Sequence, residues 1–250
     1  MNNQKEKVKE KEEEEEKDKE TFPTPTKKLK EILEKKDEKN RKIVLISTGS
    51  YNPVHKMHIK TFAIAKKYLE EKHGLDVIGG YISPSHDQYT LGKLGGYNIP
   101  FKERCEMCQL AIEEEGLQDF LFLDQWEGTQ SNFINFTTVT RHLRHYLKTT
   151  FASSNIDVFY LCGMDHFVKC RLYHWEKVVA MSRPGYDDSE HINENVSKDI
   201  YVSYNSEFQM DISSSEIRKR FIIGKGVEDL TYKSVIDHLK KINWLDLKKK

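Results

Sequence analysis

Apolar and polar positions follow two different patterns along this chain after residue 42. Short runs rich in β-branched residues recur, and between most of them apolar residues are spaced three or four positions apart. The first pattern is typical of buried strands and the second of amphipathic helices. The predicted strands cover residues 43–47, 77–82, 120–123, 158–162, 178–181 and 200–204. This order predicts a doubly wound, Rossmann-like α/β fold, in which a parallel sheet is flanked by helices.

Two stretches give the clearest helical patterns. After the first strand, Ile59, Phe62 and Leu69 share one face of a helix that should begin at about Met57. A second pattern follows residues 99–101 and runs to about residue 115. Segments 85–98 and 184–199 are polar or rich in glycine, so we expect mobile loops there. No repeat of 20–50 residues is seen, which argues against a solenoid.

The first 41 residues differ in composition from the rest. Of the first 40 residues, 25 are Lys, Glu or Asp, and residues 21–26 contain two prolines that interrupt any helix. We therefore expect a charged, disordered tail over residues 1–41 and a single domain over residues 42–250. A partner-docking or targeting role for the tail stays open.

Charge and cysteine content narrow the class of protein. The formal net charge is zero, which argues against nucleic acid or an anionic membrane as a partner. Neither a membrane-spanning run nor a signal peptide is seen, so an intracellular place, in nucleus or cytoplasm, is expected. Cys105 and Cys108 have C-x-x-C spacing without a second such pair, so reduced structural thiols are expected and no resident metal site is predicted.

The loop after the first strand has the composition of a phosphate site. Gly49 allows close backbone approach, and His55 and His58 lie three residues apart at the start of the predicted helix. Helix N-termini at the carboxyl edge of such a sheet attract anions. The loop lacks both the G-x-G-x-x-G and the P-loop patterns. It resembles instead the G-x-F-x-P-x-H-x-x-H motif of the nucleotidylyltransferase superfamily, with Tyr51 in the aromatic position.

That resemblance implies an ATP site with residue roles. His58 would steady charge on the reacting phosphate, and His55 would support it. The ATP site would also include Gly49, Ser50 and Tyr51.

A second candidate phosphate site lies near the C-terminus. The segment 211–220 places serines ahead of a predicted helix that carries Ile217 and Arg218. It is similar to the superfamily string I-S-S-T-x-I-R, with Ser215 in place of the usual Thr. By that resemblance, Arg218 would bind the β and γ phosphates of ATP, and Ser214, Ser215 and Ile217 would join the ATP site.

Further strings resemble the eukaryotic-type nicotinamide/nicotinate mononucleotide adenylyltransferases over nearly all of residues 42–245. They are I-S-P-x-x-D-x-Y at 82–89, W-E-x-x-Q-x-x-F at 126–133, L-C-G-x-D at 161–165, a Trp at 175 and S-R-P-G at 182–185. The resemblance implies that Gly163 and Asp165 bind ATP, Asp165 through ribose hydroxyls. It assigns the mononucleotide site to Tyr89, Lys93, Trp126, Phe133, Thr137, Asp165, Trp175 and Arg183.

Three departures from this family affect the mononucleotide and adenosine sides. Phe133 replaces a Trp or Tyr, and the following threonines are displaced by one position, so the partner of the pyridine substituent stays open. Met210 stands where an Asn is found in the human-type enzymes, and the stretch after Tyr89 is longer than usual. Neither phosphate motif is affected.

Together these resemblances imply adenylyl transfer from ATP to nicotinamide or nicotinate mononucleotide, with Mg²⁺ accompanying ATP and NAD or deamido-NAD as product. They also imply self-association as a homo-oligomer. The alternatives are another nucleotidylyltransferase, such as a phosphopantetheine adenylyltransferase, and a nucleotide-binding or chaperone-like module without turnover. Class I aminoacyl-tRNA synthetases have a similar pair of histidines, in an H-I-G-H string, at this place, but no K-M-S-K-S string is present here.

Overall fold

The computed structural model describes residues 24–36, 41–182, 199–203 and 210–244. Its centre is a sheet of six strands in the order β3-β2-β1-β4-β5-β6, with every neighbouring pair parallel. The strands are β1 (Lys42–Gly49), β2 (Asp76–Pro84), β3 (Leu121–Leu123), β4 (Ile156–Gly163), β5 (Val178–Met181) and β6 (Ile200–Ser203). All six predicted strands are confirmed. The order reverses direction between β1 and β4, as expected for a doubly wound sheet.

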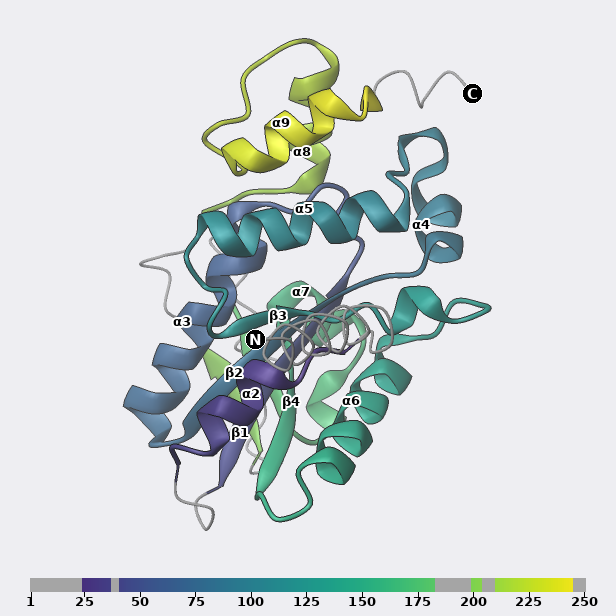
Figure 1. Ribbon diagram of the computed structural model, residues 1–250. Helices are drawn as coiled ribbons and strands as arrows, with labels where there is room; N and C mark the ends of the chain where they lie inside the picture. Colours follow the sequence, from purple (N-terminus) through teal and green to yellow (C-terminus); the bar gives the residue numbers. More distant parts are fainter. Residues whose placement is uncertain (1–23, 37–40, 183–198, 204–209, 245–250) are drawn as a thin grey trace, which may run out of the picture.

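Helices cover both faces of this sheet (Figure 1). The α-helices are α2 (Lys27–Leu33), α3 (Lys56–His73), α4 (Asp87–Leu94), α5 (Phe101–Glu114), α6 (Phe136–Thr150), α7 (Met164–Lys169), α8 (Ser214–Ile222) and α9 (Lys233–Lys241). Short 3₁₀ turns lie at η1 (Gly95–Tyr97), η2 (Glu127–Thr129) and η3 (Leu172–His174). The predicted helices after β1 and before β3 are thus found as α3 and α5.

Alternate residues of β1 face two separate apolar layers, because successive side chains of a strand point to opposite faces. Ile43 and Leu45 pack with α3, α5 and α9, whereas Val44 and Ile46 pack with α2, α6 and α7. Burial on both faces explains why the strand is a continuous apolar run rather than an alternating one. It also holds the loop after β1 at a fixed place.

The segment 24–36, which we call the N-terminal strap, differs from the expected disordered tail. Its helix α2 lies across the sheet, with Leu29 and Leu33 buried in the layer that contains Val44 (Figure 1). The Tyr81 hydroxyl donates to the carbonyl of Pro25 at 2.7 Å. Sequence analysis missed the strap because two buried leucines are few among so many charges. The start of the expected tail lies outside the described residues.

The expected loop at 85–98 is also different, because it contains α4 and η1. The His86 imidazole accepts the Gln88 amide at 3.1 Å and so caps α4. Glycines at 92 and 95 made this segment look irregular in the sequence. Nearly all of the second expected loop, 184–199, lies outside the described residues.

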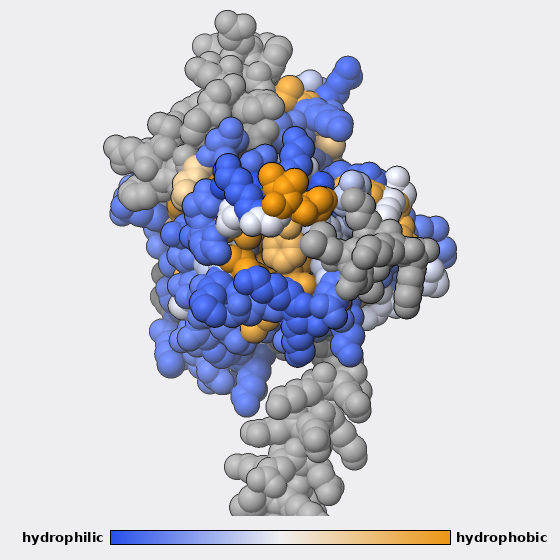
Figure 2. Space-filling model, turned by 90° about the horizontal axis from the view of Figure 1, so that it is seen from above, coloured by the Kyte–Doolittle hydropathy of each residue, from blue (hydrophilic) through white to orange (hydrophobic). Residues whose placement is uncertain are grey.

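Seen from above, the described surface is mainly hydrophilic, with a limited hydrophobic area between hydrophilic residues (Figure 2). Exposed apolar residues include Ile222 and Ile223 at the end of α8. Among the described residues, no helix combines the length and apolar character needed to cross a bilayer.

Candidate active site

A cavity of about 680 Å³ opens at the carboxyl ends of β1 and β4. This is the point where the strand order reverses, and crevices there are the usual ligand sites of doubly wound sheets. The end of β1 contributes residues 47–51, the start of α3 contributes Met57 and His58, and the end of β4 contributes residues 160–163. The cavity therefore joins the loop after the first strand to the L-C-G-x-D string.

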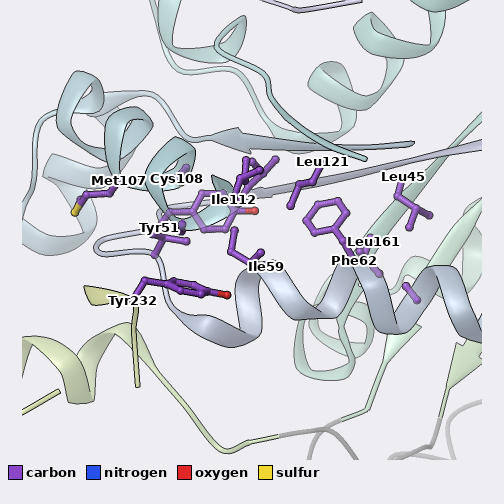
Figure 3. Close-up of a cluster of buried hydrophobic side chains, with 14 of the residues drawn as sticks. Leu45, Tyr51, Ile59, Phe62, Met107, Cys108, Ile112, Leu121, Leu161 and Tyr232 are labelled. Carbon is purple, nitrogen blue, oxygen red and sulfur yellow. The ribbon is translucent and has the colours of Figure 1, made fainter. Parts of the chain in front are cut away.

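Tyr51 fixes the loop after β1. Its ring is only 4% exposed and packs among residues of α3 and α5, including Ile59 and Met107 (Figure 3). The hydroxyl donates to the carbonyl of Ser47 at 3.1 Å. Gly49 lies beneath the ring, because a Cβ there would come within 3.1 Å of it. Both residues line the cavity, but Tyr51 acts mainly as an anchor of the loop.

His55 and His58 form the cap of α3. Their rings stack with centroids 3.4 Å apart. The His58 Nδ1 accepts the His55 amide at 3.1 Å, and the His55 Nδ1 accepts the His58 amide at 3.3 Å. Burial, with a smaller contribution from His55, lowers the pKa of His58 well below its ordinary value. The ring is therefore neutral at pH 7, and because Nδ1 is an acceptor its proton is on Nε2.

The C-terminal motif docks onto the same loop. One Arg218 nitrogen donates to the carbonyl of Asn52 at 2.7 Å, and another donates to the Ser215 hydroxyl at 3.0 Å. The Ser214 hydroxyl donates to the carbonyl of Pro53 at 2.9 Å. A guanidinium has five N–H donors, so Arg218 keeps further donors for a ligand.

None of the four predicted ATP residues of α8 lines the cavity itself. The side chain of Ile217 is fully buried in a separate core cluster, so only its backbone could meet ATP. Met210 and Ile212, just before α8, do line the cavity. The second motif thus lies beside the cavity, joined to it through the loop at 52–53.

Aromatic rings also line the cavity. Tyr89 of α4 and Phe133 stack with centroids 4.9 Å apart, and each is 39% exposed. The Gln88 side-chain oxygen accepts the Phe133 amide at 2.9 Å and ties the two segments together. The Lys93 ammonium lies 5.6 Å from the Tyr89 ring centroid. Tyr89, Lys93 and Phe133, which the resemblance assigns to the mononucleotide, all line the cavity.

The other predicted aromatic residues have different positions. Trp175 stacks on Phe136, which lines the cavity, at 5.3 Å between centroids. Trp126 stacks on His142 of α6 at 3.6 Å and is outside the cavity lining, so its structural role is packing. Arg183 lies outside the described residues.

Thr137 also lies outside the cavity lining, and its hydroxyl donates to the side chain of Asn135. Asn135 caps α6, where its side-chain oxygen accepts the Thr138 amide at 3.0 Å. Asn135 itself lines the cavity. The structure therefore places Asn135, rather than Thr137, against the space that a ligand would occupy.

Beyond the end of β4, the cavity is lined by Asp165 and also by His166, which sequence analysis missed. Asp165 is exposed and lines the cavity, with Gly163 beside it. His166 lines it too, edge-on to Phe136 at 4.9 Å and with Nε2 3.4 Å from the Tyr160 hydroxyl. Burial is the largest cause that lowers the pKa of His166, so its ring is neutral at pH 7. A tyrosine inside a predicted strand is expected to be a core residue, so the sequence did not indicate a functional role for Tyr160.

Arg104 of α5 is a second residue that the sequence did not reveal. It is completely buried and donates to the carbonyls of Ile99 at 2.8 Å, Ser50 at 3.0 Å and Ser85 at 2.6 Å. A fourth bond reaches the Asp87 carboxylate at 3.0 Å. Arg104 thus ties the loop after β1 to the segment after β2. A single arginine in an amphipathic helix carries no sequence signal for such a role.

Glu127 is a buried acidic residue that lines the cavity. It is 1% exposed, and one oxygen accepts the His86 amide at 3.0 Å. Burial raises the pKa of Glu127 to about 7, although Arg104 and the His86 amide act against this. Among the described residues, no group of three or more His, Cys, Asp or Glu side chains is arranged to hold a metal ion.

Comparison with known proteins places this geometry in a family. The model of the cytidylyltransferase-like family matches residues 46–220, which is more than half of the chain. A nicotinamide/nicotinic acid mononucleotide adenylyltransferase from Arabidopsis thaliana is 31% identical over 222 residues, covering 80% of this chain and 88% of that protein. A Danio rerio protein named nicotinamide/nicotinic acid mononucleotide adenylyltransferase 2 is 39% identical over 106 residues, 42% of this chain and 33% of its own length.

Solved structures agree in fold. A Plasmodium falciparum nicotinic acid mononucleotide adenylyltransferase complexed with NaAD superposes with a TM-score of 0.56, covering 83% of this chain and 98% of its own, at 16% identity. The same enzyme complexed with APC gives 0.55. At that identity the structures show the fold, and the family rests on the sequence matches. The chain therefore belongs to the cytidylyltransferase-like family and, within it, to the nicotinamide/nicotinic acid mononucleotide adenylyltransferases.

Proposed function

We propose that this chain transfers the adenylyl group of ATP to nicotinamide or nicotinate mononucleotide, forming NAD or deamido-NAD and pyrophosphate. The observation that carries the proposal is one cavity shared by two kinds of wall. The neutral His58 at the N-terminus of α3 lines this cavity, and the exposed Tyr89–Phe133 pair lines it as well. The first suits the phosphates of ATP, and the second suits a flat pyridine ring.

In the reaction, an oxygen of the mononucleotide 5′-phosphate attacks the α-phosphorus of ATP in line. The bond from that phosphorus to the oxygen bridging the β-phosphate breaks, and pyrophosphate leaves with the electron pair. The nucleophile is already an anion, so the protein needs no general base. Catalysis then consists of positioning and charge stabilisation, as in other phosphoryl chemistry.

The two phosphate motifs divide this work. His58 donates from Nε2 to a phosphate oxygen, and as a neutral donor it keeps its proton through the reaction. Arg218 is held beside the cavity by Asn52 and Ser215, and we expect its remaining N–H groups to bind the leaving pyrophosphate. The N-terminus of α3 adds a favourable dipole at the same place.

The other wall binds the mononucleotide. Tyr89 and Phe133 offer ring faces to the pyridine, and Lys93 contributes a cation nearby. Asp165 is placed to accept ribose hydroxyls, and Asn135 offers an amide beside Phe133. Trp175 supports Phe136 from behind.

Mg²⁺ would enter with ATP, held mainly by phosphate oxygens, since the described residues provide no cluster of carboxylates for it. When bound, the ion supplies charge neutralisation on the triphosphate. Self-association and a place in the nucleus or cytoplasm are part of the proposal and await light scattering and imaging of a tagged chain.

The test incubates the full chain with ATP and Mg²⁺ and, in parallel, nicotinamide mononucleotide, nicotinate mononucleotide or phosphopantetheine. Pyrophosphate and dinucleotide are measured together. Formation of dinucleotide with the pyridine mononucleotides supports the proposal and ranks the amide and acid forms. Release only with phosphopantetheine, or ATP binding without any product, would refute it.

His58→Ala tests the assignment of the phosphate side. We expect turnover to fall by roughly 100-fold or more, since removing one preorganised donor costs about that much. The variant also loses a cap acceptor, with an expected cost of about 1 kcal/mol in stability. His145→Ala, at an exposed site on α6, is the control and should be neutral. Near-normal turnover of a folded His58→Ala protein would contradict the assignment.

A further inference from the structure

The N-terminal strap ends in a buried hydrogen bond. Thr24 is 3% exposed, and its hydroxyl donates to the Asp124 carboxylate at 2.5 Å. The strap lies outside the residues matched by the family model, 46–220. Leu29 and Leu33 of α2 cover the apolar surface of the sheet. The Thr24 hydroxyl instead binds a buried carboxylate 100 positions away in the sequence, which indicates a second role for the strap.

Asp124 follows β3 directly and is 1% exposed. Besides Thr24, the Ser83 hydroxyl donates to its second oxygen at 2.8 Å, and the Trp126 amide approaches its first oxygen at 3.4 Å. A buried carboxylate must have such donors, since an unpaired one is costly. The strap therefore completes the shell of a group that holds the ends of β2 and β3 together.

The segment held by Asp124 continues directly into the mononucleotide wall. Glu127 follows Trp126, lines the cavity, and accepts the His86 amide at 3.0 Å. His86 in turn caps α4 by accepting the Gln88 amide at 3.1 Å.

From Gln88 the connection reaches the aromatic pair. The Gln88 side-chain oxygen accepts the Phe133 amide at 2.9 Å, and Phe133 stacks on Tyr89. An unbroken series of contacts thus runs from the Thr24 hydroxyl to the ring pair. A second series of contacts runs from Asp124 through Ser83 and Ser85 to Gly49 in the loop after β1, so both substrates have to be measured.

We propose that Thr24 is a positioning residue for the mononucleotide site, acting through Asp124 on the segment that carries Glu127 and on the Tyr89–Phe133 pair. This inference rests on the proposed function for the identity of the ligand. It assigns to the N-terminal strap a larger role in the affinity for the mononucleotide than in the affinity for ATP.

The test compares three variants of the full chain. Thr24→Val keeps the shape but removes the donor, and Thr24→Ser restores it. Tyr81→Phe is the matched control, because it removes another hydrogen bond of the strap, the one to Pro25, and no hydrogen bond to Asp124. Each is measured for thermal midpoint, for the KM of both substrates, and by calorimetry for binding of nicotinate mononucleotide.

We expect Thr24→Val to raise the KM for the mononucleotide about five- to tenfold, as loss of a hydrogen bond to a charged group allows, with the KM for ATP within about twofold. Thr24→Ser should recover most of the affinity, and Tyr81→Phe should lower the thermal midpoint without the change in KM. An unchanged mononucleotide KM in Thr24→Val, an equal rise in Tyr81→Phe, or a matching loss for ATP would overturn the proposal.

Failure of the proposed function would give a different result. In that case the wild-type chain itself would form no dinucleotide from either pyridine mononucleotide. Wild-type turnover with an unaltered Thr24→Val protein would leave the function standing and refute only the role of the strap.

Discussion

Arg104 offers the sharpest test of how the site is held. In Arg104→Met, a side chain of similar length replaces a completely buried guanidinium that makes four hydrogen bonds. The change leaves the carbonyls of Ile99, Ser50 and Ser85 without this donor. The Asp87 side chain is 36% exposed, so water can replace its lost partner.

The magnitude follows from those groups. Each carbonyl left without its donor costs about 1 kcal/mol or somewhat more, and Asp87 adds a fraction of that, for a total of roughly 3–4 kcal/mol. With a slope of about 2.5 kcal/mol per molar urea, the unfolding midpoint should fall by roughly 1.4 M. Turnover should fall as well, because the carbonyl of Ser50 belongs to the loop after β1.

Urea unfolding followed by tryptophan fluorescence measures this change, with Arg144→Met as the control. The Arg144 side chain donates one hydrogen bond, to the carbonyl of Val158 at 3.2 Å, and its Nε has no partner among the described residues. The control should lose about 1 kcal/mol at most. If the two variants had equal midpoints, the view that Arg104 ties the two loops together would be wrong.

Three other predictions follow from single contacts. Burial raises the pKa of Glu127 from 4.5 to about 7, so between those pH values the folded state binds more protons than the unfolded state. The free energy of unfolding therefore falls as pH rises, by at most about 1.4 kcal/mol per pH unit. Glu127→Gln should abolish this dependence in urea midpoints measured across pH 4–8. Gly128→Ala should cost about 1–3 kcal/mol in urea unfolding, because its Cβ would lie 2.0 Å from the Phe101 ring, whereas Gly92→Ala, with open space, should be neutral or stabilising. Phe133→Leu should raise the KM for the mononucleotide several-fold with little change for ATP, and an equal rise for both would count against the ring-stacking role.

The strands could be predicted because parallel strands buried on both faces are continuous β-branched runs. Ile43 to Ile46 show this, since their side chains fill two apolar layers at once. The strap and α4 could not be predicted in this way, because tertiary contacts stabilise them. Leu29 and Leu33 fit a surface formed by distant strands, and α4 depends on the bond between Asp87 and Arg104.

The residues of the candidate site also fall into those that local sequence could place and those that tertiary contacts place. Residues of short contiguous motifs, such as His58 and Asp165, were placed at the cavity, because local sequence fixes their position at a strand or helix end. Trp126 was expected at the ligand but stacks on His142, a partner 16 positions away that no motif specifies. His166 was missed for the same reason, since its contacts depend on how α7 packs on β4.

The cap of α3 ties the proposed phosphate contact of His58 to the integrity of the fold. Most helices use a small hydroxyl or carboxamide residue for this purpose, but here the two stacked imidazoles exchange bonds with each other's amides. Inactivating substitutions at either position would therefore also loosen the first turn of α3. A variant that loses both imidazoles should therefore lose stability at the start of α3 together with the proposed contact to phosphate.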